Sequence, residues 1–201
     1  MKGRFNAIIN QYKSESDKNV DRCIRRAKNQ KSLPEAIKVA SLSVDEDDKK
    51  DPHQYRIPKV TLASWYGAIL MRLASLKKAK TFDEIHNILT GVKIKGVGKV
   101  TVYDTAVRIG VYKKLYPQKI YLHAGTKEGA KKLNVKTSSK DILKSQLPVQ
   151  FQRKDLSCLE IEDILCIYKD ILDPSLDQKS FYLGLAKIAS RHSRKKGTRG
   201  C

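Results

Sequence analysis

Residues 81–112 read TFDEIHNILTGVKIKGVGKVTVYDTAVRIGVY, and our interpretation of the whole chain starts from this stretch. Thr81 and Glu84 have the spacing of a capping box, in which each side chain bonds the backbone amide of the other residue at a helix start. Four apolar residues then share one helical face: Phe82, Ile85, Ile88 and Leu89. Gly91 is expected to leave this helix in the left-handed conformation. A second helix is expected over 100–112, with Val100, Ala106, Val107 and Ile109 as its packing positions.

The loop between these two helices contains the pattern Ile94-Lys95-Gly96-Val97-Gly98-Lys99. With this pattern, residues 81–110 resemble the helix-hairpin-helix family of nucleic-acid-binding motifs, in which a hydrophobic-Gly-hydrophobic-Gly hairpin joins two short helices. The resemblance implies a hairpin that grips the phosphate backbone and reads no base. A dinucleotide-binding fingerprint also begins with G-x-G, but the preceding strand and the third glycine that it needs are missing here.

The chemistry of the loop agrees with a phosphate site. Two glycines let the backbone turn tightly and approach a phosphate closely, and the helix that follows offers free amides and the positive end of its dipole. The alternative is a glycine turn between core helices that contacts no ligand. For the hairpin we predict nucleic-acid contacts from Lys93, Lys95, Gly96, Val97, Gly98, Lys99 and Thr101, and we predict supplementary contacts from Lys77, Lys78, Lys80, Arg194, Lys195, Lys196 and Arg199.

The charge balance of the chain points to an anionic partner. It has 41 Lys and Arg against 21 Asp and Glu, a formal net charge of +20. Such an excess repels itself and is best tolerated when a polyanion neutralises it. We expect nucleic acid, with duplex DNA as the partner, bound with little sequence preference and strong salt dependence. An anionic membrane surface and a basic protein with merely solvated lysines are the alternatives.

The remaining patterns predict an all-α fold, a compact helical body that carries the hairpin. Helices are expected over 4–12, 17–28, 32–42, 61–76, 156–172 and 174–191, and a short extended segment can form at 119–122. Ser32 with Pro34 and Glu35 marks a helix start, and Asp173 before Pro174 marks another. The predicted organisation is N-terminal helices in 1–43, an acidic exposed linker in 44–57, a helical core in 58–190 and a flexible basic tail in 191–201.

Two features of this organisation have a second interpretation. Trp65 could stack on a base, but its place in the apolar stripe of 61–76 favours the core. Asp45, Glu46, Asp47, Asp48 and Asp51 could hold a metal or imitate nucleic acid, but a solvated linker is the simpler interpretation. The apolar surplus of 156–172 is expected in the core, with a protein partner as the alternative.

An enzyme is the second hypothesis for the function. The helix-hairpin-helix family includes DNA glycosylases, which place a catalytic Asp about two dozen residues after the hairpin, and a member would act in DNA repair by base excision. His123 stands where the resemblance would require that Asp, and Asp104 falls inside the second helix. His123 is therefore a weak catalytic candidate, since a histidine that caps the next helix is the simpler interpretation. A third hypothesis is an RNA-associated basic protein.

The sequence predicts no cofactor, no metal and no membrane segment. The four cysteines form no C-x-x-C pair, and no histidine lies beside them at zinc-finger spacing. No apolar run approaches the ~18 residues of a spanning helix, and the first residues do not form a signal peptide. We therefore expect an intracellular, cytoplasmic protein associated with nucleic acid.

Overall fold

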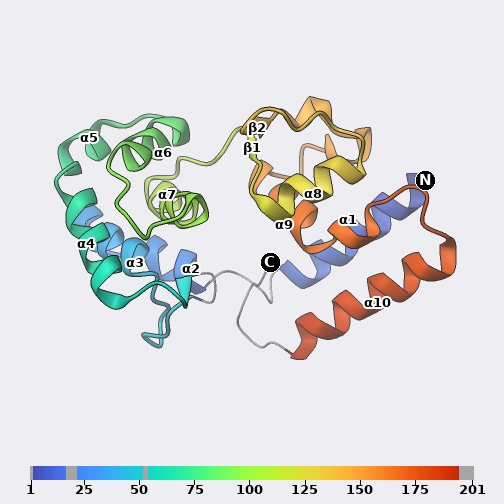
Figure 1. The fold of residues 1–201 in the computed structure, drawn as a ribbon, viewed down its shortest axis with the longest axis horizontal. Coiled ribbons are helices and arrows are strands. Elements are labelled where there is room, and N and C mark those ends of the chain that lie inside the picture. Colours follow the sequence, from blue (N-terminus) through green and yellow to red (C-terminus); the bar gives the residue numbers. More distant parts are fainter. Residues whose placement is uncertain (1, 17–21, 52–53, 195–201) are drawn as a thin grey trace. The chain divides into compact units, whose positions relative to one another are not determined.

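The chain is mostly helical, as its periodicity predicts. A computed structural model describes residues 2–16, 22–51 and 54–194, which contain ten α-helices and one two-stranded sheet (Figure 1). The described chain forms two compact units. We call residues 20–117 the hairpin unit, and we call the described residues of 1–19 and 118–197 the terminal unit.

This division differs from the single core predicted for 58–190. The first helix, α1 (Lys2–Ser16), packs with the last part of the chain. The Gln11 side chain donates to the Leu185 carbonyl at 3.1 Å, and the Lys13 ammonium lies 2.7 Å from an Asp155 carboxylate oxygen. Contacts between residues more than 140 positions apart leave no trace in local periodicity, so the pattern could not reveal them.

The hairpin unit is built around one central helix. Its helices are α2 (Arg22–Lys28), α3 (Leu33–Leu42), α4 (Lys59–Leu70), α5 (Leu73–Lys78), α6 (Phe82–Gly91) and α7 (Lys99–Lys113). Most of α7 is buried, and it packs against α2, α3 and α6. Trp65 is fully buried and its indole N–H donates to the Thr105 hydroxyl at 3.2 Å. The core position predicted for Trp65 is confirmed.

The helix bounds predicted from the local sequence are correct for part of the hairpin unit. The capping box of Ser32 and Glu35 is present and α3 ends at Leu42, as predicted. The predicted helix over 61–76 is interrupted, because the backbone at Arg72 (φ −104°, ψ 13°) leaves helical geometry between α4 and α5. Residues 17–21 of the helix predicted over 17–28 lie outside the described residues.

Around the hairpin, three local predictions need correction. The Thr81 hydroxyl accepts from the Glu84 amide as expected, but the Glu84 carboxylate accepts from the Lys80 amide at 2.6 Å. Gly91 is still helical, and among the described glycines only Gly96 has a positive φ. Val100 is 38% exposed because it lies in the first turn of α7, whereas the other three predicted packing positions of this helix are buried.

The acidic segment is exposed at residues 46–49, as its composition predicts, but it is not a free linker. Asp45 is buried and accepts from the Asp47 and Lys49 amides at 2.9 Å. Its neighbours form ion pairs with α2: Arg22 with Asp47, Arg25 with Glu46, and Arg26 with Asp48. Asp51 pairs with the buried Arg108 of α7 at 3.0 Å. Arginines that are distant in sequence therefore fold this segment onto the hairpin unit.

The terminal unit combines four helices with a small sheet. Its elements are α1, β1 (Ile120–Tyr121), α8 (Ala124–Lys132), β2 (Asp141–Ile142), α9 (Cys158–Ile167), α10 (Gln178–Arg194) and three short 3-10 helices (Lys144–Gln146, Val149–Phe151 and Lys169–Ile171). The strands are antiparallel, with Ile120 opposite Ile142. The extended segment predicted at 119–122 is therefore confirmed.

The last two predicted helices begin later than expected. The helix predicted over 156–172 is α9 followed by a 3-10 turn, and its apolar side chains lie in the unit's own core, including Leu156, Ile161, Ile164, Leu165 and Leu172. Asp173 accepts from the Ser175 amide and hydroxyl and so holds a turn. The cap of α10 is Asp177, which accepts from the Ser180 amide at 2.9 Å. This helix extends to Arg194, so the predicted tail begins inside it, and residues 195–201 lie outside the described residues.

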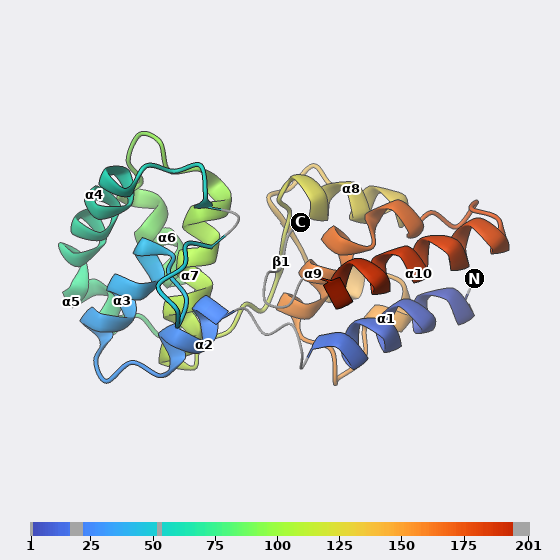
Figure 2. The same cartoon turned by 90° about the horizontal axis from the view of Figure 1, so that it is seen from below.

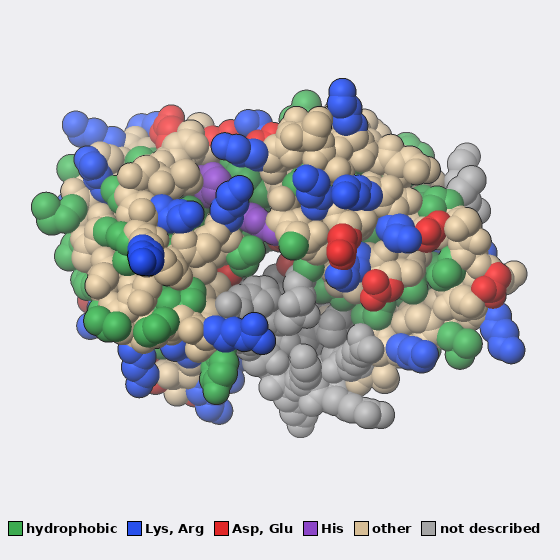
Figure 3. All heavy atoms as spheres, in the orientation of Figure 1, with side chains coloured by type: hydrophobic (Ala, Val, Ile, Leu, Met, Phe, Trp, Pro, Cys, Tyr) green, Lys and Arg blue, Asp and Glu red, His purple; other side chains and the backbone are tan. Residues whose placement is uncertain are grey.

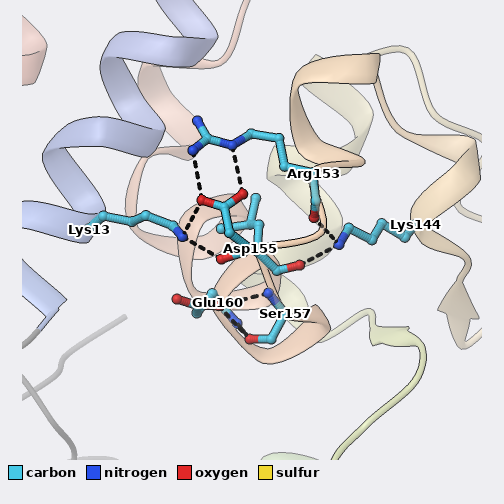
Figure 4. A network of polar contacts seen from close by, with 7 residues as sticks. Lys13, Lys144, Arg153, Asp155, Ser157 and Glu160 are labelled. Carbon is cyan, nitrogen blue, oxygen red and sulfur yellow. Dashed lines mark hydrogen bonds and ion pairs between the residues drawn. The ribbon is translucent and has the colours of Figure 1, made fainter.

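A polar network fixes the loop that leads into α9 (Figure 4). The Asp155 carboxylate accepts two hydrogen bonds from Arg153 and one from Lys13. These bonds hold the pKa of Asp155 well below its usual range. The Lys144 ammonium donates to the carbonyls of Arg153 and Leu156. The network therefore ties α1 and the loop together at the start of α9.

Candidate nucleic-acid interface

The hairpin between α6 and α7 is anchored on one side and open on the other. Val97 is 2% exposed and its amide donates to the Ile94 carbonyl at 3.3 Å, which closes the turn. Gly96 has φ +87°, a conformation that side chains rarely adopt. Both flanking glycines are exposed. Val97 thus fixes the loop to the core, while Gly96 and Gly98 form its outer surface.

Gly98 is the N-cap of α7, and its conformation does not require a glycine. Its φ of −82° and ψ of 170° suit any residue, and a Cβ placed there would meet nothing within 4 Å. The first bond of the helix runs from the Val102 amide to the Gly98 carbonyl at 3.1 Å. The amides of Lys99, Val100 and Thr101 therefore have no partner within the helix. A Ser, Asp or Asn at this position could cap them, whereas Gly places no side chain over them. Lys99 and Val100 are exposed residues, but Thr101 is buried.

The predicted hairpin residues divide into exposed and buried groups. Lys93, Lys95 and Lys99 are exposed around the loop. Thr101 is only 4% exposed, and its carbonyl accepts from the Thr105 hydroxyl at 2.7 Å. The burial of Thr101 makes its hydroxyl a poor donor for an external phosphate, which corrects that part of the prediction.

The segment before α4 lies beside the hairpin, and the sequence analysis missed it. A Cβ on Gly96 would lie 3.2 Å from the Thr61 methyl group in the first turn of α4, and Figure 2 shows the two regions next to one another. The Gln54 amide group donates to the Asp104 carboxylate at 2.5 Å, in the second turn of α7. Residues 54–61 therefore run between the second turn of α7 and the hairpin, and the exposed Arg56 and Lys59 belong to this segment.

One sequence signal could have revealed this neighbour. Residues 52–82 and 85–103 together contain nine Lys and Arg and no Asp or Glu. Figure 3 shows that Lys and Arg side chains are otherwise spread over the visible surface and do not form one patch. Net charge alone therefore does not single out one surface, whereas the absence of acids along two segments that meet in space does distinguish the surface around the hairpin.

The other predicted cations do not join the hairpin. Lys77, Lys78 and Lys80 are exposed at the end of α5, where the Lys113 ammonium donates to the carbonyls of Leu76 and Lys77. Burial, with the nearby Lys80 charge, lowers the pKa of Lys113. Lys113 ends α7 and Lys99 begins it, so about 20 Å separate these groups. Arg194 ends α10 in the terminal unit, and Lys195, Lys196 and Arg199 lie outside the described residues.

The catalytic candidate lies in the terminal unit. His123 is at the N-cap position of α8 but makes no side-chain cap bond, contrary to the expected capping role. The first turn of α8 instead contacts α9: the buried Thr126 hydroxyl donates to the Glu162 carboxylate at 2.8 Å. Asp104 lies within α7, as predicted, and its carboxylate is engaged by Gln54.

In the described ranges, no three His, Cys, Asp or Glu side chains come together as metal ligands. None of the described helices combines the length and apolar character that a membrane span requires. Comparison of the chain with models of protein families, with curated proteins and with solved structures gives no match.

Proposed function

We propose that the hairpin unit binds nucleic acid, with duplex DNA as the expected ligand, by holding the phosphate backbone at residues 93–99. The observation that carries the proposal is Gly98, a glycine without a conformational or packing reason at the start of an uncapped helix. A phosphate oxygen can reach the open amides of α7 only if no side chain covers them. Lys95 and Lys99 supply charge beside that position. Contacts of this kind give little sequence preference.

The test gives α7 a cap of its own. Gly98→Asp places a carboxylate where it can accept from the open amides, so folding stability should stay the same or rise by a few tenths of a kcal/mol. The same carboxylate competes with a phosphate and repels it. We expect the affinity for a labelled DNA duplex to fall about 10- to 100-fold, which corresponds to one lost charge-assisted contact. Fluorescence anisotropy at about 0.1 M salt measures the affinity.

The matched control is Gly67→Asp in α4. Gly67 is also exposed with nothing within 4 Å of its Cβ, so this variant adds the same charge to the same unit. At about 0.1 M salt it should bind DNA to within roughly threefold of the parent, because residue 67 lies about 9 Å along α4 from Thr61, close to the Debye length of about 10 Å, and its charge makes no direct contact with the phosphate. Equal affinity of the Gly98→Asp and Gly67→Asp variants would mean that the hairpin is a turn between two helices and does not bind the phosphate backbone. Binding of an RNA duplex in preference to DNA would change the ligand and keep the site.

The salt dependence separates the two groups of lysines. Replacing Lys95 and Lys99 together by Ala should lower the slope of log affinity against log salt by about 2, since each phosphate contact contributes about 1. Replacing Lys77 and Lys78 removes the same charge from the far end of α7, and this pair should leave the slope nearer to that of the parent. The reverse order would place the phosphate contacts at the end of α5.

A further inference from the structure

A rigid turn beside the hairpin presents an aromatic ring to solvent. The Ile57 amide donates to the Gln54 carbonyl at 2.9 Å, so Tyr55 and Arg56 occupy the tip of a β-turn. The turn is fixed at both ends, by the bond from Gln54 to Asp104 and by the Lys50 ammonium, which donates to the Ile57 carbonyl at 2.7 Å. Tyr55 is nevertheless 75% exposed. The backbone that carries the ring is thus held in place, while the ring itself is not packed.

The position of this turn relates the ring to the candidate phosphate site. Gln54 lies at the second turn of α7 and Thr61 lies at Gly96, so Tyr55 and Arg56 are held between these two anchor points, beside the first turns of α7. Val60, in the first turn of α4, is 72% exposed. The acid in this neighbourhood, Asp104, is occupied by Gln54. Basic and apolar side chains therefore surround the hairpin.

A uniform duplex cannot use such a ring, because its bases are stacked on one another and only their edges face the grooves. An unpaired base offers its face, and aromatic and guanidinium groups stack on it regardless of sequence. The backbone of the turn is already ordered and a Tyr side chain has only two rotatable dihedral angles, so stacking on Tyr55 costs little conformational freedom. We propose that the surface formed by residues 54–60 and 93–100 binds DNA at a junction of duplex and single strand, with an unpaired base stacked on Tyr55.

This inference rests on the proposed function of the hairpin, and the experiment separates the two. Anisotropy compares the full chain on a blunt DNA duplex and on the same duplex with a short single-stranded extension. The parent should bind the extended DNA at least about fivefold more tightly, the lower end of what one base–aromatic stack contributes. Tyr55→Ala should remove that preference and leave blunt-duplex affinity unchanged, whereas Tyr55→Phe should retain it. Tyr182→Ala, at a 52% exposed tyrosine of the terminal unit, is the control.

Each outcome has a distinct meaning. If the preference for extended DNA survives in Tyr55→Ala, or if Tyr182→Ala removes it equally, stacking on Tyr55 is wrong. If the parent binds both DNAs equally and Gly98→Asp weakens both, the phosphate site stands and the junction proposal fails. If the parent binds neither DNA, the function proposed for the hairpin fails, and this inference fails with it. Because Tyr55 is exposed, circular dichroism should show unchanged folding in both variants.

Discussion

The first turns of α7 and α8 share two features and differ in the groups that contact them. Each helix follows an N-cap residue whose side chain makes no cap bond, and each has a buried Thr at its third position, Thr101 and Thr126. At α8 the Glu162 carboxylate accepts from Thr126, so an acid of the same unit lies near the positive end of the helix. At α7 the adjoining segments 52–82 and 85–103 contain no acid.

The glycines of these two helices show the same contrast. In α8, a Cβ on Gly125 would lie 2.5 Å from the Cys166 sulfur, and a Cβ on Gly129 would lie 2.0 Å from the Leu165 carbonyl oxygen. These glycines are needed for the close approach of α8 and α9. At the start of α7, Gly98 has no neighbour within 4 Å of its Cβ. A glycine explained by packing says nothing about ligands. Gly98 shares its open surroundings with Gly3, Gly67 and Gly91, and it differs from them because it is the N-cap of a helix that no side chain caps.

The largest expected effect is at Gly129. Gly129→Ala forces α8 away from the α9 backbone, which cannot move aside as a flexible side chain could. We expect a loss of about 3 kcal/mol in the free energy of unfolding, the upper end for overpacking. Chemical denaturation followed by circular dichroism measures it. Gly3→Ala, in α1 of the same unit with open space around it, should change stability by less than about 0.5 kcal/mol. Similar values for both variants would contradict the packing role of Gly129.

Gly96 should show an intermediate effect. Gly96→Ala places a side chain at φ +87° and 3.2 Å from Thr61, at a cost of about 1–3 kcal/mol. Trp65 is the chain's single tryptophan and is buried in the hairpin unit, so its fluorescence reports the unfolding of that unit. Gly98→Ala should shift the same transition by less than about 0.5 kcal/mol. A large loss with Gly98→Ala would reveal a structural reason for that glycine and weaken the proposed phosphate site.

A smaller effect is expected where α8 meets its internal acid. Glu162→Gln keeps an oxygen that can accept from Thr126 but removes the charge near the helix start, so we expect a loss of about 0.3–1 kcal/mol at low salt. Added salt should reduce the difference from the parent because it screens the charge. Asp170→Asn, at an exposed acid of the same unit, controls for the change in net charge. Equal losses in the two variants would mean that the position of Glu162 does not matter.

Sequence alone predicted features that depend on near neighbours. Ser32 and Glu35 are three residues apart and cap α3 as expected, and Trp65 follows from its place in an apolar stripe. The acidic segment was mispredicted as a free linker because its partners are distant: Arg108 is 57 positions from Asp51. At Thr81 the predicted bond from the Glu84 amide to the Thr81 hydroxyl forms. The Glu84 carboxylate, however, accepts from the neighbouring Lys80 amide and not from the Thr81 amide that the capping box predicts.

The candidate site shows the same limit. The pattern 94–99 identifies the hairpin, because two glycines and the helix after them are contiguous. Tyr55, Arg56 and Lys59 reach it only through the contacts of Gln54 with Asp104 and of Thr61 with Gly96. Those contacts join residues 50 and 35 positions apart, and periodicity carries no information about them. The one feature of the local sequence that the two segments share is that neither 52–82 nor 85–103 contains Asp or Glu.

The smallest expected effect concerns the far end of α8, where Lys132 pairs with Asp173 at 3.0 Å. Hydrogen bonds from Ser175 and Lys132 lower the pKa of Asp173 to about 2, below the roughly 3.9 of an unfolded chain. A depressed pKa contributes stability that is complete above the unfolded value and is lost as the pH falls toward the folded value. The melting temperatures of the parent and of Asp173→Asn should therefore differ by a constant amount above about pH 5 and converge toward pH 2. The pair is exposed, so the difference should be small. A difference that stays constant down to pH 2 would show that the charge of Asp173 does not stabilise the far end of α8.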